Sequence, residues 1–170
     1  MGRLPYSSIS VKHLCEQANL SRKVFYRYYN GKLDVLTSIF RRDVLQPTLD
    51  LCELLSFEKI WPRAASTEQH MFQAVYDDRE FYGNVARAPQ GGEEAFLKAA
   101  GLVFAEWCRF VLQKQRYPER SWQTAYIVSF FSHAKAHYLL DWLLDDCTPS
   151  VEEAAGLFSD MALPFWRALD

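Results

Sequence analysis

The sequence predicts an all-α protein in which a small helix-turn-helix head at the N-terminus is joined to a larger helical bundle. Apolar side chains recur at helical spacing through most of the chain, without strand-like alternation or an internal repeat. Residues 1–43 hold eight basic and three acidic side chains, net +5, whereas the remainder holds eleven and eighteen, net −7. A basic head on an acidic body favours a polyanion as the partner of the head. We therefore expect a head over residues 1–43 and a body over residues 44–170.

Composition narrows the class of protein. Hydrophobic residues make up 49% of the 170 residues and aromatic residues 15%, enough for a sizeable core. The longest apolar stretches are too short to span a bilayer, and the N-terminus lacks the pattern of a signal peptide. Four cysteines lie far apart with no CxxC pair, which indicates reduced, buried thiols of a cytoplasmic protein. They are Cys15, Cys52, Cys108 and Cys147.

The head begins with a short helix that Ser10 can cap and that we expect to reach Asn19. Its apolar stripe follows the i, i+3, i+4, i+7 spacing and consists of Val11, Leu14, Cys15 and Ala18. Asn19 suits the sharp helix exit because asparagine tolerates the left-handed conformation better than other non-glycine residues. Leu20 is then expected to point into the interior of the turn.

A second short helix is predicted from its cap, Ser21, to about Tyr29, where Asn30-Gly31 breaks it. Phe25 and Tyr29 lie one turn apart and would face inward. The outward positions carry cationic and phenolic groups, and the segment has no acidic residue. An ordinary structural hairpin would more usually mix acidic and basic side chains on its surface. The pattern therefore favours a helix that binds DNA over a purely structural hairpin.

The body is predicted to consist of longer helices separated by proline and glycine. One helix is expected from Lys32 to about Leu55, bent or interrupted at Pro47. Trp61-Pro62 opens the next helix, and Pro164 bends or ends the last one. The other expected helices cover residues 81–86, 93–115, 120–146 and 150 onward, with a loop at 89–92.

Residues Ala18-Asn19-Leu20-Ser21, followed by Phe25-Tyr26-Arg27-Tyr28-Tyr29 and Lys32, resemble the DNA-binding region of TetR-type bacterial repressors. The resemblance implies phosphate contacts by Ser10, Tyr26, Tyr28 and Lys32 and by backbone donors at Ser21. It implies base contacts by Arg22, Lys23 and Val24 in the first turn of the second helix. The family often has Gly-Thr at the positions of Lys23-Val24, so no sequence preference is carried over.

The family also packs a first helix across these two, and the sequence shows no counterpart for it. Met1 to Ile9 is too short and is interrupted by Pro5. Part of the apolar face of the head would then contact water. Three explanations stay open: the chain is shortened, another element covers this face, or the head is loosely folded and binds DNA poorly.

The segment Tyr126 to Glu153 is similar to the regulatory domain of the same family. The similarity implies a homodimer formed by the last two helices, which agrees with a helix over residues 120–146 that is apolar around most of its circumference. A pocket for a small apolar or aromatic effector is a further possibility, although aromatic side chains at helical spacing more often form core. The candidate pocket residues are Phe72, Tyr76, Phe104, Trp107, Tyr126 and Phe130.

Metal binding and catalysis find little support in the sequence. His133 and His137 stand at i, i+4, a spacing that can hold a metal, but only Asp141 is near enough to be a third ligand. Glycine-rich phosphate loops, GxSxG, HExxH and paired carboxylates in a cleft-like context are missing. We expect a protein that is not an enzyme and that uses no metal or cofactor.

The first hypothesis is a dimeric TetR-type transcriptional regulator of the repressor kind. Its head would bind double-stranded operator DNA, and an effector or partner at the body would control the spacing of the two heads. The alternative is a non-DNA-binding dimeric regulator that acts through protein–protein contacts.

Overall fold

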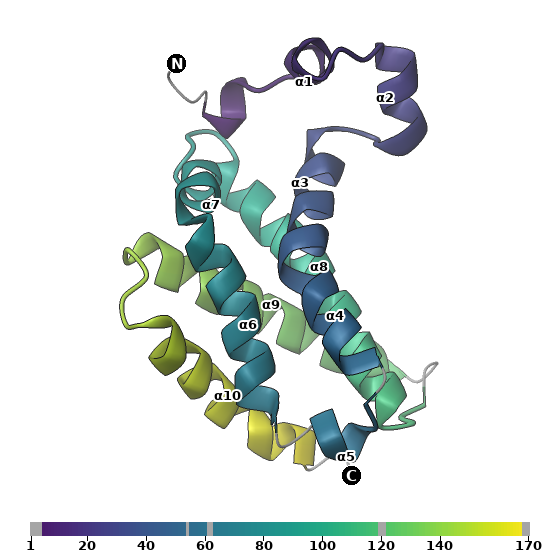
Figure 1. Cartoon of the computed structure of the whole chain (residues 1–170), viewed down its shortest axis with the longest axis vertical. Coiled ribbons are helices and arrows are strands. Elements are labelled where there is room, and N and C mark those ends of the chain that lie inside the picture. Colours follow the sequence, from purple (N-terminus) through teal and green to yellow (C-terminus); the bar gives the residue numbers. More distant parts are fainter. Residues whose placement is uncertain (1–4, 54, 61–62, 119–121, 168–170) are drawn as a thin grey trace.

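The computed structural model describes residues 5–53, 55–60, 63–118 and 122–167, and every regular element within these ranges is a helix. This confirms the predicted all-α class. The elements are η1 (Tyr6–Ser8), α1 (Val11–Gln17), α2 (Arg22–Tyr28), α3 (Lys32–Phe40), η2 (Arg41–Leu45), α4 (Gln46–Glu53), α5 (Phe57–Ile60), α6 (Ala64–Asp77), α7 (Arg79–Ala86), α8 (Gly92–Lys114), α9 (Trp122–Leu144) and α10 (Val151–Arg167). Figure 1 shows α1 and α2 at one end of the molecule, away from the bundle.

Local sequence signals place the two head helices as predicted. The Ser10 hydroxyl accepts a hydrogen bond from the backbone N–H of His13 at 3.2 Å, and Ser21 caps α2 in the same way through Val24. Asn19 has a φ of 52°, the left-handed conformation expected at this turn. The expectation for Leu20 is wrong, because its side chain is 47% exposed instead of filling the turn.

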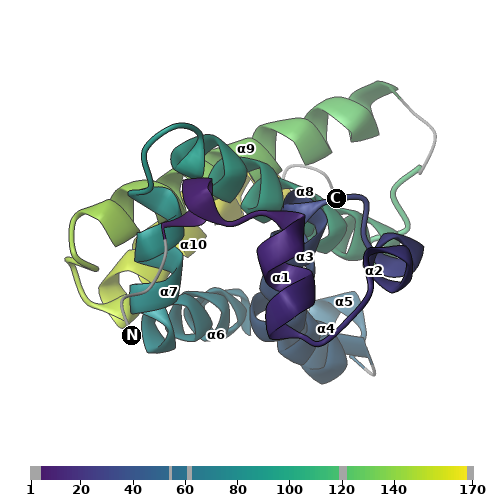
Figure 2. The same cartoon turned by 90° about the horizontal axis from the view of Figure 1, so that it is seen from above.

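The N-terminal segment covers part of the head side of α3, a role that the sequence did not indicate. Tyr6 of η1 is buried and belongs to the same apolar cluster as Leu36 and Phe40. Lys32 holds it there: the ammonium donates to the Tyr6 carbonyl at 2.9 Å and lies 4.3 Å from the centre of the Tyr6 ring. Residues 5–9 thus form a second link between the head and the bundle (Figure 2).

One continuous helix, α3–η2–α4, connects the head to the body. The sequence predicted a bend or interruption at Pro47; the helix instead widens to π-helical hydrogen bonding over Arg41–Leu45 and continues to Glu53. A proline ring clashes with the carbonyl four residues earlier, here that of Asp43, and the wider turn relieves this contact. The expected boundary at residue 43 falls inside this helix.

The bundle is built around α8. This helix packs against α3, α7 and α9, while α10 covers α6 (Figure 1). The core contains large apolar side chains from each of these helices, among them Phe40, Phe72, Tyr82, Phe96, Phe104 and Leu139. Proline at position 164 does not end α10, which continues to Arg167. Trp61-Pro62, the expected start of a helix, lies outside the described residues.

Among the described helices, none is both long enough and apolar enough to cross a membrane. Helix α9 has apolar side chains around most of its circumference, but its inner face is buried against α8 and α10. Its N-terminal part extends beyond the bundle (Figure 2).

The head should be the least stable part of the molecule. Only Cys15 and Phe25 are buried within α1 and α2, and neither belongs to the main core cluster. Short helices depend on packing for their stability, so local opening of this hairpin should cost little free energy. Native-state hydrogen exchange should therefore be faster in α1 and α2 than in α9 and α8. Equal protection of the two regions would contradict this expectation.

Candidate functional site

The exposed surface of α2 is basic and phenolic. Arg22, Lys23 and Arg27 are exposed, as are Tyr26 and Tyr28, while Phe25 turns inward and packs against the Tyr29 ring at 5.5 Å. Val24 is half-buried at the end of the first turn. The structure therefore presents most of the expected DNA-contact residues on a single helix that stands clear of the body (Figure 1).

The two capping serines lie at the N-termini of α1 and α2. Each hydroxyl oxygen accepts a backbone N–H within its own turn, so the hydroxyl proton remains available to donate. A helix N-terminus carries a partial positive charge and free backbone donors, which suits phosphate oxygens. Ser10 and Ser21 are thus placed to support anion binding without leaving their capping positions.

Lys32 is separated from this set. Its side chain is half-buried and its ammonium is engaged by the Tyr6 carbonyl and the Tyr6 ring. An ammonium held in this way is less free to reach a phosphate than Arg22 or Lys23. The structure gives Lys32 the role of anchoring η1 on α3.

One side of the head is open to solvent. A hollow of about 680 Å³ lies between the two helices, with Cys15 and Leu20 as its apolar members. Its other lining residues are Lys12, Glu16, Asn19, Ser21 and Arg22. The lining of this hollow is mostly polar. Of the apolar side chains expected on the inner face of the head, Cys15 and Phe25 are buried and Val11, Leu14 and Tyr29 are half-buried, so this face is only partly exposed.

The six aromatic residues considered for an effector pocket do not meet around one cavity. Phe72, Phe104 and Trp107 are buried in the core, and Tyr76 is half-buried beside Trp142. Tyr126 and Phe130 lie on the outer face of α9 and are 72% and 65% exposed. With Trp122 they form an exposed aromatic stripe on that helix, and α10 exposes Leu157 and Met161.

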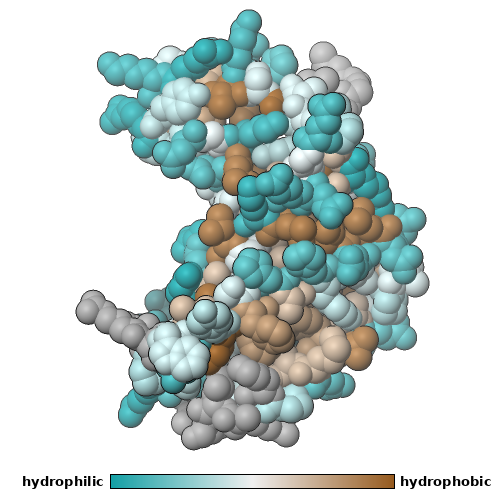
Figure 3. All heavy atoms as spheres, turned by 180° about the vertical axis from the view of Figure 1, so that it is seen from behind, coloured by the Kyte–Doolittle hydropathy of each residue, from teal (hydrophilic) through white to brown (hydrophobic). Residues whose placement is uncertain are grey.

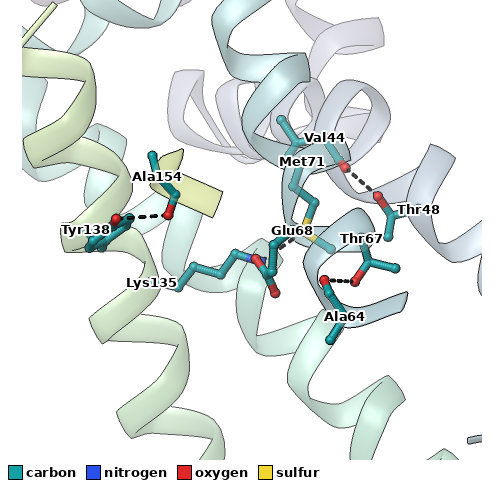
Figure 4. A network of polar contacts seen from close by, with 9 residues as sticks. All are labelled: Val44, Thr48, Ala64, Thr67, Glu68, Met71, Lys135, Tyr138 and Ala154. Atoms are coloured by element: carbon teal, nitrogen blue, oxygen red, sulfur yellow. Dashed lines mark hydrogen bonds and ion pairs between the residues drawn. The ribbon is translucent and has the colours of Figure 1, made fainter. Parts of the chain in front are cut away.

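A buried ion pair lies inside the bundle (Figure 4), and sequence reasoning missed it. Lys135 on α9 is 2% exposed, and its ammonium is 2.5 Å from a carboxylate oxygen of Glu68 on α6. The same ammonium is 3.0 Å from the Met71 sulfur and lies over the rings of Phe104 and Phe158, at 4.6 and 5.6 Å from their centres. A lysine in the middle of an apolar helix was the available signal.

The ion pair sits in a region of strongly reduced solvation. Burial raises the pKa of the neighbouring Cys108 thiol to about 12, with a smaller opposing effect from Lys135. Because desolvation of both charges offsets their attraction, a buried ion pair often contributes no more stability than apolar side chains of similar size.

A groove of about 1070 Å³ runs along the outer face of α8, between α9 on one side and α3–α4 on the other. Its floor contains Gly101, Leu102 and Ala105. Figure 3 shows apolar residues exposed on one surface of the bundle. The α9 wall includes Val128, Ser129 and His133.

The two histidines of α9 are both exposed. His137 Nδ1 lies 2.9 Å from the His133 carbonyl, and His133 Nδ1 lies 3.3 Å from the Ser129 hydroxyl. Within the described part of the chain, no cluster of three His, Cys, Asp or Glu side chains is arranged to hold a metal.

Comparison with known families finds a match in the body of the chain. A family model, TetR_C_8, described as "Transcriptional regulator C-terminal region", matches residues 66–163. The matched range begins in α6 and ends in α10, so it includes Glu68 and Lys135 but not the head. No curated protein matches the chain.

Removal of one partner of the buried pair should be much more costly than removal of both. Lys135→Met leaves the Glu68 carboxylate buried without its cation and should lower the free energy of unfolding by about 3–5 kcal/mol, measured by urea denaturation. The double variant Lys135→Met, Glu68→Leu should recover most of this loss. Lys98→Met is the matched control, because it breaks the exposed pair with Glu94 and should cost less than about 1 kcal/mol. Equal losses in the single and double variants would show that the ion pair is not the cause.

Proposed function

The chain belongs to the TetR family of transcriptional regulators, and we propose on this premise that it is a homodimeric repressor that binds operator DNA through α2. The observation that carries the proposal is the outer surface of α2, a capped, acid-free helix with Arg22 and Lys23 in its first turn. A helix of this width fits the major groove of DNA, where arginine and lysine donate to guanine O6 and N7.

The proposed contacts divide into positioning and reading. Tyr26, Tyr28 and the caps Ser10 and Ser21 supply hydroxyl and backbone donors for phosphate oxygens, which set the orientation of the head but carry little sequence information. Base edges would be contacted by Arg22, Lys23 and Val24. Lys32 would contribute indirectly, because its ammonium donates to the Tyr6 carbonyl and so holds η1 against α3.

We assign dimerisation to the outer faces of α9 and α10. Trp122, Tyr126 and Phe130 form a stripe of exposed aromatic side chains, and isolated subunits rarely leave such an area in contact with water. A two-fold dimer would place two heads on half-sites about one helical turn, or a multiple, apart.

Effector control is assigned to the surroundings of Lys135 and Glu68 rather than to the six aromatic residues taken together. The pair joins α6 to α9, and Phe104 and Phe158 bring α8 and α10 to the same ammonium. A small molecule with an anionic or polar group and an apolar body could replace Glu68 as the partner of Lys135 and shift these helices.

The alternative function is regulation through a partner protein without DNA binding. The small core of the head favours it, because a helix pair with only Cys15 and Phe25 buried is a less rigid DNA-binding unit than a closed domain. A folded dimer that binds no duplex DNA at low salt would support this alternative.

Substitutions in α2 separate the two kinds of DNA contact. Lys23→Ala should relax preference at one or two base pairs, at a cost of about 1–3 kcal/mol on the preferred duplex. Tyr26→Phe should weaken binding to all duplexes about equally, since it removes a phosphate contact. Lys59→Ala, which removes an exposed cation of α5, is the control and should leave binding unchanged. Fluorescence anisotropy with a set of single-base operator variants measures each effect. Uniform weakening by Lys23→Ala would place that side chain on phosphate instead.

A further inference from the structure

We propose that α10 of a second copy of this chain occupies the groove on the outer face of α8. The inference rests on the proposed dimer and states where the partner helix lies. It extends the interface from α9 and α10 to α8 and to the helix that carries the head.

The floor of the groove is shaped to receive a helix. Leu102 is 55% exposed there, between the small residues Gly101 and Ala105. A Cβ atom added at Gly101 would meet no other atom within 4 Å, so the space above this position is open. An apolar floor with small residues allows the close approach of another helix.

The groove also holds an uncompensated positive charge. Arg109 lines it, and no carboxylate among the described residues pairs with its guanidinium. The other charged groups are neutralised within the chain: Lys98 pairs with Glu94, and Glu106 with Arg41 at 2.8 Å. An occupant that brings an acidic group beside apolar side chains would complement the site.

The exposed face of α10 has this composition. Leu157 and Met161 project from it one turn apart, and Asp160 lies beside them with no described partner. Arg167, at the C-terminal end, is the only basic residue of the helix. The chain therefore carries both an apolar groove with a free cation and an apolar helix face with a free anion.

The groove is continuous with the proposed dimer face. Ser129 and His133 line it from α9, and Tyr126 and Phe130 of the exposed stripe lie on the same helix next to them. A partner that covers the stripe therefore reaches the groove. In a two-fold dimer each copy would both donate α10 and accept it, which buries both sets of groups in a single closed assembly.

Occupation of the groove would reach the head. Leu33 and Leu49, from α3 and α4, line the wall opposite α9. A partner helix seated there would contact the continuous helix that carries α1 and α2. The position of the head would then depend on how the two subunits are packed.

Charge reversal tests the proposal. Arg109→Glu and Asp160→Arg should each raise the dimer dissociation constant by about tenfold or more, measured by sedimentation velocity over a range of protein concentrations. The double variant should return to within about threefold of the unmodified chain, because the pair is restored with its charges exchanged. Lys12→Glu, which reverses an exposed cation of the head, is the matched control and should have no effect.

A second variant tests the shape of the groove without a charge change. Gly101→Leu fills open space and should weaken the dimer, measured by sedimentation velocity, while the helix content measured by circular dichroism stays unchanged. Phe130→Glu tests the proposed dimer itself and should give monomers. If Phe130→Glu dissociates the dimer but the Arg109, Asp160 and Gly101 variants do not, the groove proposal is overturned while the dimer stands. If the unmodified chain is purely monomeric, both the dimer and the groove proposal are overturned. If the groove binds a small molecule or another protein and the dimer is unaffected, only the groove proposal is overturned.

Discussion

The continuous helix from Lys32 to Glu53 is the element on which the rest of the structure depends. The inner face of its central part is buried, with Phe40, Val44 and Leu45 packed in the bundle, while its first turn carries the head. Arg41 ties it to Glu106 of α8, so the two helices are joined by charge as well as by apolar contact. Because α1 and α2 make few contacts of their own with the bundle, the position of the head depends on the direction of this helix and on the second link, in which Lys32 holds Tyr6. A change in the packing of α8 would therefore move the proposed DNA-binding surface.

The proposed effector control depends on the buried ion pair between Lys135 and Glu68. A bundle held only by apolar contacts gains nothing from a buried lysine, and such pairs contribute little net stability. In the proposed control, a group that competes for either charge would change the relative position of α6 and α9. The Lys135 ammonium also contacts Phe104 of α8 and Phe158 of α10, so such a change would reach these two helices as well. Effector binding and subunit packing would then act on the same set of helices.

Local features of this fold could be predicted from sequence, and contacts between distant residues could not. Ser10, Ser21 and Asn19 act through their own turn, so helix capping and the left-handed exit follow from a few adjacent residues. Two contacts depend on how whole helices pack together, which hydrophobic periodicity does not specify. They are the hydrogen bond from Lys32 to the Tyr6 carbonyl and the ion pair between Lys135 and Glu68. The aromatic residues show the same limit: helical spacing identified Phe104 and Tyr126 alike, but one is core and the other surface. The sequence marked Pro47 as a site of bending or interruption, but it did not predict the π-helical turn over Arg41–Leu45 that precedes the proline.

Selection from a random library of duplex DNA with the folded, unmodified chain tests the central claim most directly. If the protein is a dimeric DNA-binding regulator, the retained duplexes should share a two-fold symmetric motif with half-sites about ten base pairs, or a multiple, apart. Their affinity should fall steeply with salt concentration, as phosphate contacts by the basic head require. No retention of any duplex at low salt by a chain shown to be folded and dimeric would contradict the account.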